Sequence, residues 1–191
     1  MDSEIATAAP RFGKMCRGSV KHEAMRTDLK DVAIERATGG DVEAIVKLAQ
    51  ENGPDRGGEL SVRLTSEAVA ARMQKLPNIV ARRGCHLIGF LLTSERTATA
   101  SPIVSAMLKT YPGSERAYVY GPVCVAAGER GRGIAAAMFA ELRRLLPHRE
   151  GILFIKTNNH PSLRAHRKMG MRPVGEFTHD GVDLAIFSYT G

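Results

Sequence analysis

The sequence predicts a single α/β domain built on one mixed β-sheet. Strand-like and helix-like segments alternate along most of the chain. The strand-like segments show alternating polarity or short apolar runs, and the helix-like segments show helical periodicity. The chain has 191 residues, of which 43% are hydrophobic and 25% are charged, and these values are ordinary for one globular domain. A chain of this length buries enough surface to fold without disulfides or a structural metal.

The first half of the domain is predicted to contain three strands and two helices. Asp41 precedes a helix whose apolar residues share one face, Thr65 or Ser66 can cap a second helix, and Gly84 separates two antiparallel strands. Residues 96–116 are expected to form a longer connection with only a weak helical period. In order, the expected elements occupy residues 32–38, 42–50, 66–76, 78–84 and 85–95.

The second half is predicted to contain four strands and two helices. A strand ending at Val125 is interrupted by Gly121–Pro122, where we expect a bulge or a splay. Pro147 ends the long helix, and Asp180–Gly181 marks the turn of a final hairpin. In order, the expected elements occupy residues 117–125, 134–145, 151–157, 162–169, 171–178 and 182–189.

The ends of the chain and its cysteines predict a cytoplasmic protein. Residues 1–30 show no clean period and are expected to form a tail or arm before a domain over residues 31–191. The N-terminus lacks the pattern of a signal peptide, and no apolar run is long enough to span a membrane. The three cysteines cannot all pair, and none lies in a CxxC motif, which fits a reducing compartment.

Positive charge is concentrated in one quarter of the sequence. Residues 130–172 contain ten Lys or Arg and only two Glu, a net charge of +8 in a chain whose total is +7. This segment is expected to meet an anionic partner, although a solvated helix face would also explain it. Nucleic acid is not expected, because the chain has no Trp and no basic run interleaved with aromatics.

The most informative stretch joins a strand to a helix through a loop that contains glycine and arginine. Arg130, Gly131, Arg132 and Gly133 stand where the helix begins. Free backbone N–H groups and the helix dipole favour anions there, and glycines let a phosphate approach closely. Residues 131–136 also fit the dinucleotide fingerprint GxGxxA, but a charged loop intervenes after the strand, and the next strand ends in amides where the fingerprint has an acidic residue.

This stretch resembles the acyl-CoA loop of the GNAT superfamily of N-acetyltransferases. The family pattern (Q/R)xxGx(G/A) is matched by Arg130, Gly133 and Ala135, and Val125 also has the family spacing. Downstream, NHPSLRAHRKMGM is similar to the second family motif, and the element order over about 160 residues agrees with the family. The resemblance implies a mostly antiparallel sheet of six to seven strands, splayed at the acyl-CoA site, with helices on both faces.

The resemblance also implies acetyl-CoA as co-substrate and a set of residues that bind it. The amides of the loop would hold the pyrophosphate, and the backbone of the preceding strand would hold the pantetheine arm. The implied cofactor-binding residues are Val123, Val125, Arg130, Gly131, Arg132, Gly133, Ile134, Ala135, Asn159, Ser162 and His166.

The catalytic residues implied by the resemblance depart from the family pattern. His166 stands where the family has a tyrosine that protonates the leaving thiolate, and it could serve as the acid, pack, or cap a helix. Tyr120 is a second candidate whose hydroxyl could act instead, and Tyr118 and Tyr120 could equally be wall or core aromatics. The strand over residues 117–125 has no carboxylate, so the base is not identified.

The predicted function is transfer of an acetyl group from acetyl-CoA to an amine, by direct attack. The acceptor is a small molecule or peptide amine, and the acidic Asp55 and Glu59 would suit a cationic one. The alternative is a CoA-binding regulatory or interaction domain without transferase activity. His160 and His166 are six residues apart, so no metal site is predicted. A membrane partner is not expected, and a homodimer is left open.

Overall fold

A computed structural model describes residues 29–53, 60, 63–97 and 101–191. The predicted tail at residues 1–30 therefore lies almost entirely outside the described residues, as do Asp55 and Glu59. Among the described residues, the helices are too short or too polar to cross a bilayer.

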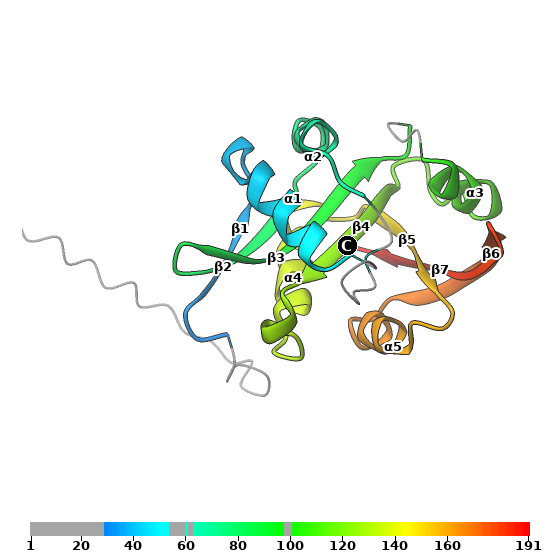
Figure 1. Cartoon of the computed structure of the whole chain (residues 1–191). Coiled ribbons are helices and arrows are strands. Elements are labelled where there is room, and N and C mark those ends of the chain that lie inside the picture. The colour runs from blue at the N-terminus through cyan, green and yellow to red at the C-terminus, as the bar shows by residue number, and fades with distance from the viewer. Residues whose placement is uncertain (1–28, 54–59, 61–62, 98–100) are drawn as a thin grey trace, which may run out of the picture.

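A seven-stranded sheet forms the centre of the domain (Figure 1). Its spatial order is β1-β2-β3-β4-β5-β7-β6, and neighbours are antiparallel except β4 and β5, which are parallel. This confirms the mixed, mostly antiparallel sheet that the sequence predicts. The strands are β1 (Val32–Arg36), β2 (Ile79–Arg83), β3 (His86–Glu95), β4 (Tyr118–Val125), β5 (Glu150–Lys156), β6 (Arg172–His179) and β7 (Val182–Thr190).

Over the residues that the structure describes, five α-helices cover the two faces of the sheet (Figure 1). Because successive side chains of a strand point to opposite faces, the core residues assign each helix to a face. Helices α4 and α5 pack against Tyr118 and Tyr120 of β4, whereas α3 packs against Val119 on the other face, which α1 and α2 also cover. The helices are α1 (Val42–Glu51), α2 (Ser66–Met73), α3 (Pro102–Thr110), α4 (Ile134–Leu145) and α5 (His160–Lys168).

The connection predicted over residues 96–116 contains helix α3, which the predicted element order lacks. Val104 and Met107 bury this helix against Val119 and Ile152. Two buried residues give a stripe too short to stand out as a helical period, so the sequence shows only a weak signal. The rest of the order agrees with the prediction, including the N-cap, where Thr65 accepts a hydrogen bond from the amide of Ala68 at 3.2 Å.

Asn78 joins the end of α2 to the sheet. Its side chain is buried, and its Nδ2 donates to the carbonyl oxygens of Leu76 at 2.9 Å and Arg72 at 3.2 Å. Its Oδ1 accepts a hydrogen bond from the amide of Thr93 on β3 at 2.7 Å. The three bonds fix the last turn of α2 over the middle of the sheet.

Replacing Asn78 with alanine is expected to lower the free energy of unfolding by about 3 kcal/mol. The change leaves the buried amide of Thr93 and the carbonyl of Leu76 without partners, and each unsatisfied group costs about 1–3 kcal/mol. Urea unfolding followed by circular dichroism measures the difference, with Asn158→Ala at an exposed position as the control. A loss below about 1 kcal/mol would contradict this role for Asn78.

Candidate active site

The middle of the sheet is open between β4 and β5. The two strands pair only at Tyr118–Gly151 and Val119–Ile152, and they diverge beyond these residues (Figure 1). On its other side β4 shifts register against β3 at Gly121–Pro122, which confirms the predicted bulge. Residues 121–123 of this central strand are partly exposed, although a central strand is normally covered. A ligand can therefore reach the backbone of β4.

The backbone of Val123 and Val125 faces this opening. The amide of Ala126 donates to the carbonyl of Ile88 on β3 at 2.9 Å. Since the amides of alternate residues in an antiparallel strand point the same way, Val123 and Val125 direct theirs away from β3. In the described part of the chain, β5 does not pair with them. Their amides are therefore left to bind an extended polar chain.

The loop after β4 ends in a glycine that begins α4. Gly131 and Gly133 have φ values of +77° and +83°, in the left-handed region that glycine adopts without strain. A Cβ at either position would meet no atom within 4 Å, so the space in front of the backbone is open. Ile134, Ala135 and Ala136 form the first turn of α4, where amides have no intrahelical partner. The glycine loop and the helix start that the sequence predicts are both present, and anion binding there stays a prediction.

The side chain of Arg130 turns back onto the protein. Its Nε donates to the carbonyl of Val125 at 3.1 Å, and its Nη2 donates to the Oδ1 of Asn52 at 2.5 Å. Asn52 is buried at the end of α1 and donates to the carbonyl of Leu48 at 2.9 Å. The guanidinium of Arg130 thus fixes the loop against α1, while the space at Gly131 and Gly133 stays open.

An ion-pair network holds the same loop against β2. Glu129 accepts two hydrogen bonds from Arg83, at 3.0 Å and 2.9 Å, and its Oε2 lies 3.8 Å from Nε of Arg132. Hydrogen bonding from Arg83 lowers the pKa of Glu129 despite some desolvation, so the carboxylate stays ionised. Arg132 remains 45% exposed and is available to an anion at the start of α4.

Helix α5 begins on the opposite side of the opening, directly after β5. Asn159 caps it by accepting a hydrogen bond from the amide of Ser162 at 3.1 Å. His166 lies in its last turn and is 9% exposed. The Nδ1 of His166 lies 2.8 Å from the carbonyl oxygen of Ser162 and 3.2 Å from its hydroxyl. Because a carbonyl oxygen can only accept, Nδ1 carries the hydrogen and Nε2 has a free lone pair.

Tyr120 has a buried hydroxyl without a hydrogen-bond partner among the described residues, and its side chain is 3% exposed. Its ring meets those of Phe139, His166 and Tyr189 edge to face, with centroids 5.9, 5.9 and 5.7 Å away. The structure therefore brings together the two predicted catalytic residues, which are 46 positions apart in the sequence. A buried hydroxyl without a partner costs free energy, so it points to a bound group that supplies one.

Burial sets the protonation of both side chains. Desolvation raises the pKa of Tyr120 far above its usual range, so the phenol remains a hydrogen-bond donor at neutral pH. Desolvation also lowers the pKa of His166 below 6.5, although its bond to Ser162 opposes the shift, so the imidazole is mainly neutral near pH 7. Tyr120 can then donate a hydrogen bond, and Nε2 of His166 can accept a proton.

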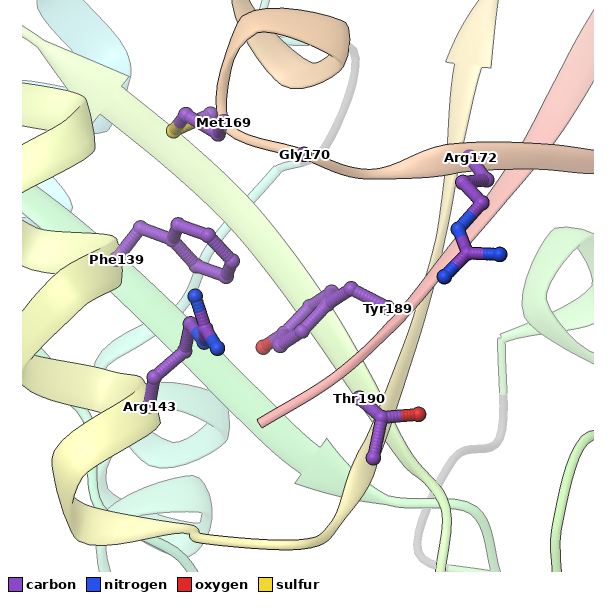
Figure 2. A pocket seen from close by; sticks show the side chains of 7 residues that line it. All are labelled: Phe139, Arg143, Met169, Gly170, Arg172, Tyr189 and Thr190. Atoms are coloured by element: carbon purple, nitrogen blue, oxygen red, sulfur yellow. The ribbon is translucent and has the colours of Figure 1, made fainter.

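A cavity of about 160 Å³ lies beside this cluster, between α4, the turn after α5 and the end of β7 (Figure 2). The guanidinium of Arg143 stacks 5.8 Å from the centre of the Phe139 ring, and Tyr189 points toward the same space. The cavity adjoins the closed end of the β4–β5 opening, because Thr190 pairs with Glu150 at the start of β5. Its lining residues are Phe139, Arg143, Met169, Gly170, Arg172, Tyr189 and Thr190.

Sequence reasoning missed several residues that shape the site. Asn52 contacts Arg130 and Tyr189 contacts Tyr120 from elements that are distant in the chain, and Arg83 binds Glu129 beside the predicted loop. Only the polarity of Asn52 at the end of an apolar helix face could have drawn attention to it. Cys124 is buried, and burial raises the pKa of its thiol to about 11, so it is a packing residue. Residues 29–53, 60, 63–97 and 101–191 hold no cluster of three metal-ligating side chains.

Several solved structures share this fold. A Salmonella typhimurium protein solved with its cofactor acetyl-CoA is 15% identical, with a TM-score of 0.61 over 83% of this chain and 93% of its own. The ribosomal-protein-S18-alanine N-acetyltransferase of Escherichia coli is 12% identical, with a TM-score of 0.61 over the same shares. NAA60 of Arabidopsis thaliana, in complex with a bisubstrate analogue, is 20% identical, with a TM-score of 0.61 over 83% of this chain and 97% of its own.

Sequence comparison identifies the family. No curated protein matches the chain. Residues 42–171, however, match the acetyltransferase (GNAT) family, a span that runs from the start of α1 to the end of the α5 motif and covers well over half of the chain. This span includes the opening between β4 and β5, the glycine loop, and both Tyr120 and His166. The chain belongs to the GNAT family of acetyltransferases.

Proposed function

We propose that this protein transfers an acetyl group from acetyl-CoA to the amine of an acceptor, by direct attack within a ternary complex. The observation that carries the proposal is the opening between β4 and β5. Tyr120, whose hydroxyl has no partner among the described residues, directly follows the last residue of β4 that pairs with β5, and the glycine loop that begins α4 follows the end of β4 that β5 leaves unpaired. Structures with this fold solved with acetyl-CoA or a bisubstrate analogue support it.

The residues around the opening fit acetyl-CoA. The amides of residues 131–136 and the guanidinium of Arg132 would hold the pyrophosphate, because a helix N-terminus and a cation both favour an anion. The free amides of Val123 and Val125 would bind the pantetheine arm as an added strand does. Asn159 and Ser162 would close the opposite side of the opening. The bound thioester supplies the activated acetyl group, and the protein orients the acceptor amine toward it.

Tyr120 and His166 would share the proton transfers. The hydroxyl of Tyr120 would donate a hydrogen bond to the sulfur that leaves, and its raised pKa keeps that proton in place until it is needed. The neutral imidazole of His166 would accept the proton that the attacking amine loses. An imidazolium acid is disfavoured because burial lowers the pKa of His166, so we assign the acid role to Tyr120.

The pH dependence of turnover distinguishes the two roles of His166. With His166 as the proton acceptor, kcat at saturating acceptor rises with pH through the lowered pKa and then reaches a plateau. With His166 as the acid, kcat would fall with pH through the same pKa. The measurement is a pH–rate profile of the wild type and of His166→Gln, which is expected to lose the acidic limb. A falling profile would contradict the proposed assignment.

The second candidate is a CoA-binding domain without transferase activity. It is favoured by two features, since β4 carries no carboxylate base and position 166 is not the tyrosine of the family pattern. Thiol release from acetyl-CoA distinguishes a transferase from a domain that only binds. A domain of this second kind would bind acetyl-CoA and release no thiol with any amine.

The experiment combines calorimetric titration of acetyl-CoA with thiol release in the presence of an amine panel. The panel contains amino acids, polyamines, aromatic amines and peptides with free N-termini. Binding together with amine-dependent thiol release supports the proposal, and absence of binding would overturn it.

Three further expectations remain predictions: a cytoplasmic location, a preference for a cationic acceptor, and a homodimer. Asp55 and Glu59, the acidic residues that suggest a cationic acceptor, lie outside the described residues.

A further inference from the structure

Arg72 extends from α2 toward the bulge of β4. Its Nη1 donates to the carbonyl oxygen of Gly121 at 3.2 Å, and its side chain is partly buried. Within the described chain no carboxylate pairs with it, and the hydrogen bond to Gly121 is the only polar contact of its guanidinium. A guanidinium has five N–H donors in a rigid fork. Most of the donor capacity of Arg72 is therefore unused.

An unpaired cation in this position is energetically unfavourable. Removing a guanidinium from water costs free energy that a paired carboxylate normally offsets, and a single neutral carbonyl offsets little of it. The same desolvation lowers the pKa of Arg72. Proteins seldom keep a partly buried charge without a partner, and a bound molecule can supply the partner that the described residues do not.

Two carboxylates on neighbouring elements, Glu67 and Glu95, are engaged elsewhere. Glu67, in the first turn of α2, is hydrogen-bonded to Thr65 and to its own backbone, which lowers its pKa. Glu95, at the end of β3, lies 3.4 Å from Arg149. Neither carboxylate pairs with Arg72. Helix α2 is held in place by the hydrogen bond that Nδ2 of Asn78 donates to the carbonyl of Arg72. The guanidinium is thus presented from a fixed helix end.

Arg72 approaches the reaction centre from the face opposite the proposed donor site. Gly121 directly follows Tyr120, whose ring packs on the α4–α5 face, whereas α2 covers the other face. The proposed pyrophosphate site lies at the start of α4. If acetyl-CoA binds on the α4 side of the sheet, the space on the α2 side of the bulge is left for the acceptor amine.

We infer that Arg72 binds a carboxylate of the acceptor, so that the acceptor is an amine that also carries a carboxylate. This inference rests on the proposed acetyl transfer and names the chemical class of its second substrate. The free donors of Arg72 match the two oxygens of a carboxylate in a bidentate pair. Such a pair anchors the acceptor one residue from Tyr120 and directs its amine toward the opening. Free amino acids and acidic N-terminal residues of peptides both present this chemistry.

The test compares matched acceptors with and without the carboxylate. Glycine, β-alanine and aspartate are each assayed beside the corresponding amide, and Asp-Gly-Gly amide is assayed beside Asn-Gly-Gly amide as the peptide arm. The wild type is expected to prefer the carboxylate member of a pair. Arg72→Gln keeps a donor for Gly121 and removes the charge, so it is expected to lower kcat/KM about 30-fold for carboxylate acceptors, mainly through KM.

The control is Lys75→Gln, which removes an exposed charge just beyond the same helix. It is expected to change neither acceptor preference nor turnover. Arg72→Gln should also leave acetyl-CoA affinity and the kcat/KM of the amide acceptors unchanged. Equal losses for carboxylate and amide acceptors would show a structural role and overturn the inference, whereas acetyl transfer itself would still stand.

A second measurement does not depend on turnover. The guanidinium signal of Arg72, identified by its absence in Arg72→Gln, is followed by ¹⁵N NMR during titration with N-acetylglycine or N-acetylglycinamide, in the presence of CoA. A saturable shift with N-acetylglycine alone supports the inference. An unchanged signal with both probes overturns it. Failure of acetyl-CoA to bind would overturn the proposed function first, and calorimetry separates that result from the others.

Discussion

Replacing Gly133 with glutamate is expected to weaken acetyl-CoA binding at least about 100-fold. The residue precedes the first turn of α4, and a side chain there would enter the open space that we assign to the pyrophosphate. A carboxylate would place negative charge beside negative charge at a helix N-terminus that otherwise favours anions. A non-glycine residue at φ +83° is also strained, which disturbs the amides at the start of α4. Calorimetry with acetyl-CoA measures the effect.

The matched control for Gly133→Glu is Gly181→Glu in the turn between β6 and β7. Gly181 has a φ of +74°, and a Cβ at this position would meet no atom within 4 Å, so the substitution adds the same charge and a similar strain. Acetyl-CoA should bind this control as it binds the wild type. If both variants bind equally well, the glycine loop does not hold the pyrophosphate.

Replacing Tyr120 with phenylalanine is expected to stabilise the free protein while it slows the reaction. The variant removes a buried hydroxyl that has no partner among the described residues, which is expected to raise the free energy of unfolding by about 1–2 kcal/mol. It also removes the proposed proton donor, so kcat should fall about 100-fold. Urea unfolding and steady-state kinetics measure the two effects on one protein preparation. A residue with only a packing role would not combine a gain in stability with a loss in kcat.

Tyr118→Phe provides the comparison for this second prediction. The hydroxyls of Tyr118 and Tyr189 are hydrogen-bonded to each other, and both are buried. Removing one leaves the other without a partner, so stability should fall by about 1–3 kcal/mol, whereas kcat should change little. The prediction for Tyr120 fails if its variant behaves as Tyr118→Phe does.

The elements with a clear period or clear boundary residues could be predicted from the sequence. Asp41 and the apolar residues after it indicate α1, and Gly84 indicates the turn between β2 and β3. The parallel pairing of β4 with β5 could not be derived from local pattern alone, because it depends on where α4 packs. The short stripe of α3 was too weak for a prediction, since tertiary burial rather than periodicity determines that helix.

The candidate site was predictable where it depends on local chemistry. Gly131 and Gly133 at a helix start indicate an anion site in any fold that exposes them, and the structure gives both the expected left-handed backbone. The inward turn of Arg130 toward Asn52 was not predictable, because the two residues are 78 positions apart. The unused donors of Arg72 were not predictable either, since they follow from which carboxylates the fold places elsewhere.

The central claim is that acetyl-CoA binds in the opening between β4 and β5, and a crystal structure of the protein with acetyl-CoA tests it most directly. The account predicts the pyrophosphate on the amides of residues 131–136 and the pantetheine along Val123 and Val125. It also predicts the thioester within hydrogen-bond distance of the Tyr120 hydroxyl. Acetyl-CoA bound elsewhere, such as in the cavity between Arg143 and Arg172 (Figure 2), would contradict it.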